Sequence, residues 1–115
     1  MEGLEFAHFL VDTLLEKKGS DILLMDISDQ AVFTDYFLIC NGDNRRQLQA
    51  LAESVTEEAK KKADQQPWGI EGQAEYGWVL VDFGDVVVHL FDPEQRDYYK
   101  LEELWNQGHI VLRMQ

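Results

Sequence analysis

The sequence predicts an α/β fold, a mixed sheet of about five strands with helices packed on it. Residues 4–18 and 44–64 place apolar side chains at helical spacing, and residues 78–82 and 86–91 are two β-rich runs joined through a tight turn. The elements follow the order helix, strand, strand, helix and then strands, which is typical of such a sheet. A chain of 115 residues fits one domain, so residues 1–115 are expected to share one hydrophobic core.

Two helices are predicted in the first half of the chain. The first spans residues 4–18 and should end at Gly19, because glycine readily takes the left-handed conformation that stops a helix. Asp43 or Asn44 can cap the second helix, which should run to about Asp64. The apolar stripe that this second helix would turn toward the core consists of Leu48, Leu51, Ala52, Val55 and Ala59.

Two strands are predicted between these helices and a third after them. Residues 22–27 form a nearly continuous apolar run, which is typical of a strand buried on both faces. Residues 35–40 form the next strand, after a loop at residues 28–33. Pro67 ends the second helix region, and a short edge strand is predicted at residues 68–71.

The C-terminal part gives weaker signals. Pro93 ends the second run of the hairpin, and residues 97–106 are expected to form a short terminal helix. Gly108 opens a tail for which the sequence predicts no definite structure.

The predicted hairpin has one wholly apolar face. If Gly84 and Asp85 form a two-residue turn, Val81 lies opposite Val88 and Val79 lies opposite Leu90. Successive side chains of a strand alternate between the two faces of the sheet. The face that should pack beneath the second helix therefore carries Val79, Val81, Phe83, Val86, Val88 and Leu90.

The other face of the hairpin allows two interpretations. An acid and an imidazole among aromatic side chains are typical of a protein interface. Alternatively, the C-terminal segment covers this face, and the histidine is half-buried with its hydrogen bonds satisfied. Under the first interpretation the partner-binding residues are Trp78, Leu80, Asp82, His89 and Phe91, bordered by Tyr98, Tyr99, Leu101, Glu102 and Trp105.

The charge of the chain favours a basic partner. Twenty-two acidic residues against ten basic ones give a formal net charge of −12. This charge repels nucleic acid and anionic membranes and attracts cationic surfaces, so neither direct nucleic-acid binding nor membrane binding is expected. The single cysteine excludes an internal disulfide, and the N-terminus lacks the basic region of a secretory signal, which together predict a cytoplasmic protein.

No pattern in the sequence predicts catalysis, a metal or a cofactor. The phosphate-binding loop and the dinucleotide fingerprint are both missing. His8, His89 and His109 lie far apart in the chain and have no zinc-ligand spacing. Cys40 ends an apolar strand and is expected to be a core residue, while Asp82 and Asp85 flank a turn and should project to different faces.

Three ordered blocks of the sequence resemble the Iojap family, the ribosomal silencing factors. The first is the stretch FTDYFLICNG at residues 33–42, followed by Arg46 and Gln47. The second is GWVLVDFGDVVVHLF at residues 77–91, and the third is RDYYKLEELW at residues 96–105. Together these blocks extend over most of the chain.

The resemblance implies a fold similar to that of nucleotidyltransferases and a homodimer in the free state. It also implies binding to a basic protein on the subunit-facing side of the large ribosomal subunit, which keeps the small subunit from joining and damps translation when nutrients are short. Nucleotidyltransferases carry Gly-Ser or Gly-Gly at the start of a helix and, on the following strand, an Asp-x-Asp or Asp-x-Glu pair that holds two metals. The corresponding turn here is Asn41-Gly42-Asp43-Asn44 without such a pair, so the chain is expected not to be an enzyme. The alternatives are an acidic adaptor for another basic protein and a nucleotide-handling enzyme.

Overall fold

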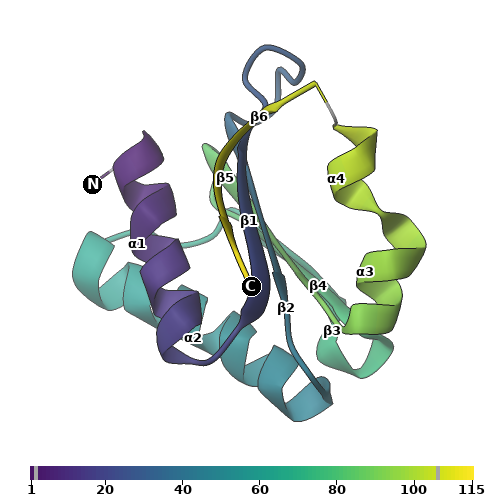
Figure 1. Ribbon diagram of the computed structural model, residues 1–115. Helices are drawn as coiled ribbons and strands as arrows, with labels where there is room; N and C mark the ends of the chain where they lie inside the picture. The colour runs from purple at the N-terminus through teal and green to yellow at the C-terminus, as the bar shows by residue number, and fades with distance from the viewer. Residues whose placement is uncertain (2, 106) are drawn as a thin grey trace.

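The computed structural model describes residues 1, 3–105 and 107–115. Over these residues a six-stranded sheet forms the middle layer, with α1 and α2 on one side and α3 and α4 on the other (Figure 1). The elements in chain order are α1 (Gly3–Glu16), β1 (Ser20–Asp26), β2 (Tyr36–Asn41), α2 (Arg45–Ala63), β3 (Gly69–Gln73), the 3-10 turn η1 (Ala74–Tyr76), β4 (Trp78–Asp82), β5 (Val86–Phe91), α3 (Pro93–Tyr99), α4 (Leu101–Leu104) and β6 (His109–Met114).

The sheet is mixed, as predicted. Its strand order is β3-β4-β5-β2-β1-β6. β2 and β5 run parallel, and every other neighbouring pair is antiparallel. The parallel pair therefore joins two antiparallel ribbons, one made by β3, β4 and β5 and the other by β2, β1 and β6.

The predicted hairpin and its apolar face are confirmed. Val79 pairs with Leu90 and Val81 pairs with Val88, and the Phe83 amide donates to the Val86 carbonyl at 2.9 Å. These side chains are buried in one core together with the apolar stripe of α2. The core on this side of the sheet is the larger of the two, because it also receives α1.

The central strands are buried on both faces, which explains their nearly continuous apolar sequences. On β1, Leu24 belongs to the core under α1 and α2, while Leu23 belongs to a second core on the opposite face. The residues of this second core are Leu23, Met25, Ile27, Ala31, Phe37, Ile39, Val87 and Phe91.

The predicted helix ends are correct to within two residues. The Asn44 side chain caps α2 by accepting a hydrogen bond from the Gln47 amide at 2.8 Å, and Asp64 ends the helix in the left-handed conformation. At the end of α1, however, Lys18 rather than Gly19 takes the positive φ, 64°. Gly19 is needed for another reason, since a Cβ atom there would lie 2.5 Å from the Cys40 sulfur.

The start predicted for the C-terminal helix was wrong, and the structure of the tail, which the sequence left open, is a strand. The expected helix at residues 97–106 begins earlier, at Pro93, and Lys100 divides it into α3 and α4 by taking a φ of 46°. Its predicted end, Asn106, lies outside the described residues. The tail after Gly108 forms a sixth strand, β6, which pairs with β1 and whose side chains are mostly exposed.

Replacing Val88 with Asp is expected to unfold the protein, because an unpaired carboxylate in an apolar core costs several kcal/mol or more. Val88 lies on β5 and is fully buried in the core that β5 shares with α2. Val32→Asp makes the same change in an exposed loop and should melt with the parent. Circular dichroism melting measures both variants. A Val88→Asp protein as stable as the parent would contradict the assignment of this face to the core.

Candidate protein-binding site

Aromatic rings form a continuous strip on the side of the sheet that carries α3 and α4. The His89 ring lies 4.8 Å from the Phe37 ring and 6.1 Å from the Phe91 ring, between centroids. Phe91 lies 6.0 Å from Tyr99. We call these rings the aromatic strip; its members are Phe33, Phe37, His89, Phe91, Tyr98, Tyr99 and Trp105.

The strip forms because β2 and the segment before it meet β5 and the helices that follow β5 on one face. In the parallel pair, Phe37 of β2 lies opposite Val87 of β5, which places His89 and Phe91 further along the same face. Asp92 then caps α3 by accepting from the Gln95 amide at 2.8 Å, and Pro93 occupies the first turn. The chain therefore turns back at once over the strands that it has just left.

A pocket of about 230 Å³ opens where α3 and α4 lean over the strip. Its walls are almost entirely apolar, and two of the side chains at its mouth, Tyr99 and Leu104, are 56% and 71% exposed. The lining residues are Trp78, His89, Phe91, Tyr99, Leu101 and Leu104. An open apolar pocket ringed by aromatic side chains is suited to receive an anchor side chain of another protein.

His89 lies deep in this pocket without a hydrogen-bond partner. It is 7% exposed, and neither ring nitrogen has a partner within the described residues. Burial lowers the pKa of His89 to about 4, so the ring is neutral at pH 7. His89 is therefore more deeply buried than the alternative interpretation of this face supposes, and within the described part of the chain its ring nitrogens lack the hydrogen bonds that this interpretation includes.

Helices α3 and α4 cover the face only in part. Leu101 and Trp105 pack on the second core, and Trp105 contacts the Phe33 and Phe37 rings at centroid distances of 5.9 and 5.5 Å. Trp78 and Leu80 remain half-buried beside them. Part of this face is therefore buried by contacts within the chain, and the rest is open.

Arg96 of α3 forms hydrogen bonds with residues near the start of β1 and at the end of β2. Its Nη1 donates to the Asp21 carbonyl and to Asn41 Oδ1, each at 2.8 Å, and its Nε donates to Glu102 Oε2 at 2.7 Å. The guanidinium side chain is only 11% exposed. Because α3 itself has no buried residue, this network is a main part of what holds it in place.

The structure brings together most of the predicted contact residues, but two of them, Glu102 and Asp82, form contacts within the chain. Glu102 is the ion-pair partner of Arg96, so it holds α4 instead of standing free at a rim. Asp82 accepts a hydrogen bond from the Gly84 amide at 2.8 Å and stabilises the hairpin turn. Both side chains are half-buried, and neither lines the pocket.

Three members of the site were missed by the sequence analysis. Phe33 and Phe37 lie more than 40 positions before Trp78, the first of the predicted partner-binding residues. For Leu104 the sequence predicts a helical position but no contact with a partner. For Phe33 a signal was available, since Val32 and Phe33 are adjacent apolar residues in the predicted loop, and both are exposed in the structure. Adjacent apolar side chains in a loop are typical of a binding surface.

Arg96→Met should lower the free energy of unfolding by about 2 kcal/mol, because it removes charge-assisted hydrogen bonds and keeps most of the aliphatic stem. Hydrogen exchange should become faster in α3 and α4 while β5 stays protected. Arg45→Met, at an exposed side chain, is the matched control. Unchanged exchange in α3 and α4 would mean that Leu101 and Trp105 hold these helices without Arg96.

Acid should destabilise the fold in part through His89. Its pKa is lowered from 6.5 to about 4 in the folded protein, so between these values the unfolded chain binds the additional proton and stability falls as pH falls. Between pH 7.5 and 5, His89→Phe should therefore lose about 2 kcal/mol less stability than the parent. Urea unfolding at both pH values measures this. His8→Phe, at an exposed histidine, should follow the parent, and an equal acid loss in His89→Phe would disprove the linkage.

Comparisons with known proteins agree with the fold and the resemblance. The family model described as "Ribosomal silencing factor during starvation" matches residues 2–114. The chain is 44% identical over 96 residues to a ribosomal silencing factor of Bacillus subtilis, covering 84% of this chain and 80% of that protein. It is 34% identical over 107 residues to the chloroplastic protein Iojap of Arabidopsis thaliana, covering 93% of this chain and 44% of that protein.

A solved structure shows the same architecture. The crystal structure of a Chromobacterium violaceum protein superposes with a TM-score of 0.87 at 40% sequence identity, covering 92% of this chain and 88% of that one. That protein therefore matches the chain in both sequence and fold. The chain therefore belongs to the ribosomal silencing factor family, which includes Iojap.

Proposed function

We propose that the protein silences translation by binding the large ribosomal subunit and blocking the joining of the small subunit. In this proposal the contact is made with a basic ribosomal protein on the subunit-facing side, and translation is damped when nutrients are short. Membership of a family named for ribosomal silencing during starvation supports the ribosome-associated role. The site of action would be the cytoplasm, and the free protein would pair as a homodimer.

The open part of the aromatic strip is the observation that carries this proposal. Tyr99 and Leu104 line the apolar pocket and are exposed, and the exposed Tyr98 ring lies beside Tyr99, so that a partner could bury all three. Aromatic side chains at the centre of an interface contribute most of the binding energy, and charged groups at the rim raise the association rate.

The two helices next to this aromatic centre are rich in acidic side chains. Glu94, Asp97 and Glu103 of α3 and α4 are exposed, against one exposed lysine, Lys100, while Arg96 is engaged in the network that holds α3. A basic protein surface is complementary to such a rim, whereas the phosphates of ribosomal RNA are repelled by it.

The proposed role is binding without catalysis or a cofactor. Among the described residues, His, Cys, Asp and Glu side chains do not gather in the groups of three that hold a metal ion. Burial raises the pKa of Cys40 to about 12, so its thiol stays protonated and packs as a core side chain. Nor does any helix in the described part of the chain have the length and apolarity to cross a membrane.

Truncation of the pocket walls should weaken binding to large subunits. Trp78→Ala and Tyr99→Ala are each expected to cost at least about 2 kcal/mol of binding free energy if the partner inserts an anchor between them. Sedimentation with purified large subunits, small subunits and coupled ribosomes measures the binding. The parent protein should pellet only with large subunits. When it is added to large subunits, small subunits should no longer join them.

Folding stability separates a binding role from a packing role. Trp78 is half-buried and packs on the second core, so its variant must be melted as well as sedimented. Tyr99 is largely exposed and should be replaced without loss of stability. Trp68→Ala removes an 80% exposed aromatic side chain outside the strip and is the control. Retained binding by folded Tyr99→Ala and Trp78→Ala would exclude the pocket as the anchor site.

A further inference from the structure

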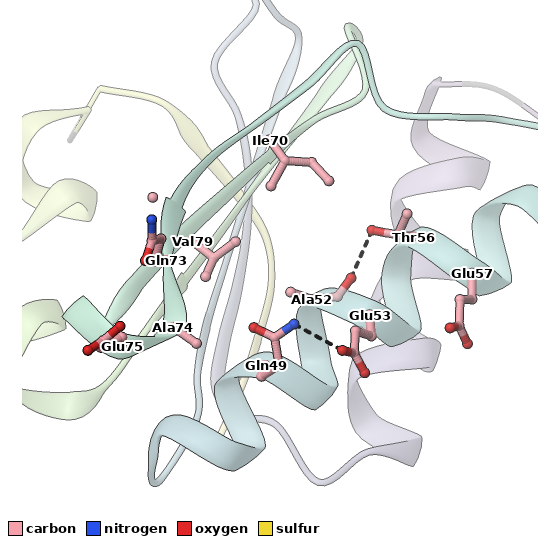
Figure 2. A pocket seen from close by; sticks show the side chains of 11 residues that line it. Gln49, Ala52, Glu53, Thr56, Glu57, Ile70, Gln73, Ala74, Glu75 and Val79 are labelled. Atoms are coloured by element: carbon pink, nitrogen blue, oxygen red, sulfur yellow. Dashed lines mark hydrogen bonds between the residues drawn. The ribbon is translucent and has the colours of Figure 1, made fainter.

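A second and larger hollow lies on the opposite side of the sheet, between α2 and the edge strand β3 (Figure 2). It has a volume of about 490 Å³. The sheet order explains its position: α2 packs on β4 and β5, and β3 lies one strand further out. We call this hollow the α2–β3 groove; it is lined by Gln49, Ala52, Glu53, Thr56, Glu57, Ile70, Gly72, Gln73, Ala74, Glu75 and Val79.

The floor of the α2–β3 groove is apolar. Ala52, Ala74 and Val79 belong to the core beneath it and are nearly inaccessible. Ile70 projects from β3 with 54% of its surface exposed (Figure 2). An aliphatic side chain placed in this hollow would be covered by α2, β3 and η1 together.

The walls of the groove carry three glutamates that the fold does not explain. Glu53 and Glu57 lie one turn apart on α2, where two like charges slightly destabilise the helix, and Glu75 lies across from them on η1 (Figure 2). All three are exposed. Within the described residues none of them forms an ion pair with a lysine or arginine, and Glu53 accepts a hydrogen bond from the Gln49 amide group at 2.9 Å.

We propose that the α2–β3 groove is a second binding surface, for a basic polypeptide segment with an aliphatic side chain between lysine or arginine residues. The aliphatic side chain would lie on Ala52, Ile70 and Val79, and the cationic side chains would pair with the three glutamates. A second copy of this chain, with 22 acidic and ten basic residues, offers the three glutamates fewer cationic partners than a basic segment does. The groove and the aromatic strip lie on opposite sides of the sheet, so both can be occupied at once, and this proposal is independent of the ribosomal one.

A peptide titration followed by nuclear magnetic resonance tests the proposal. The probe is an acetylated Lys-Lys-Leu-Lys-Lys amide added to the ¹⁵N-labelled protein. The amide signals of Gln49, Thr56, Gly72 and Ala74 should shift, and those of the aromatic strip should not. The same peptide with serine in place of leucine should bind more weakly, because it leaves the apolar floor uncovered.

Charge-matched variants separate the groove from the general attraction of an acidic protein. The triple variant Glu53→Gln, Glu57→Gln, Glu75→Gln should lose affinity at least about tenfold, since each exposed ion pair contributes a fraction of the total. The variant Glu5→Gln, Asp12→Asn, Glu16→Gln removes the same charge from exposed positions of α1 and should lose less than about twofold. Ile70→Ser tests the apolar contact without changing the charge.

Each outcome decides the proposal. Equal losses of peptide affinity in the two charge variants would show that only the overall negative charge attracts the peptide, and would overturn the proposal. Amide signals that shift only in the aromatic strip would overturn it too, as would a parent protein that does not bind the peptide. If the triple variant melts early, Ile70→Ser decides alone, because its exposed position should leave the fold intact. A loss of affinity in Ile70→Ser with the groove signals shifted in the parent supports the proposal.

Discussion

The parallel pairing of β2 with β5 is the constraint on which the rest of this structure depends. Six consecutive pairs, from Tyr36 with Val86 to Asn41 with Phe91, join segments 50 positions apart. Without this ladder the molecule would consist of two separate antiparallel ribbons, each with edges open to solvent. With it, the two strands become the centre of one sheet and are buried on both faces, which is why their sequences are nearly free of charge.

The same pairing creates the candidate binding site. It aligns Phe37 with the face of β5 that carries His89 and Phe91, so that one row of rings crosses the sheet. Helices α3 and α4 then close over part of this row. The polar contacts of Arg96 hold α3, which has no buried residue, while Leu101 and Trp105 pack the following segment on the second core. The polar attachment leaves the apolar pocket between the helices and the sheet open.

His89 is the clearest local conflict in the molecule. A buried imidazole without a hydrogen-bond partner costs free energy, and an apolar side chain at this position would avoid that cost. Groups that violate the rules of stable packing concentrate at functional sites, where the missing partner comes from a ligand. The position of His89 at the base of an open pocket agrees with that pattern.

The local elements could be predicted from the sequence: the two long helices, the five strands before Pro93, the edge position of β3 and the register of the hairpin. These follow from periodicity, caps and turn residues, which act over a few neighbouring positions. Only the tertiary structure decided that residues 109–114 form a strand, because that segment becomes a strand by pairing with β1. The same holds for the site: the tertiary structure brings Phe37 to His89, Phe33 to Trp105 and Glu102 to Arg96. Such contacts join positions distant in the chain, and no local pattern contains the information about which distant side chain will become a neighbour.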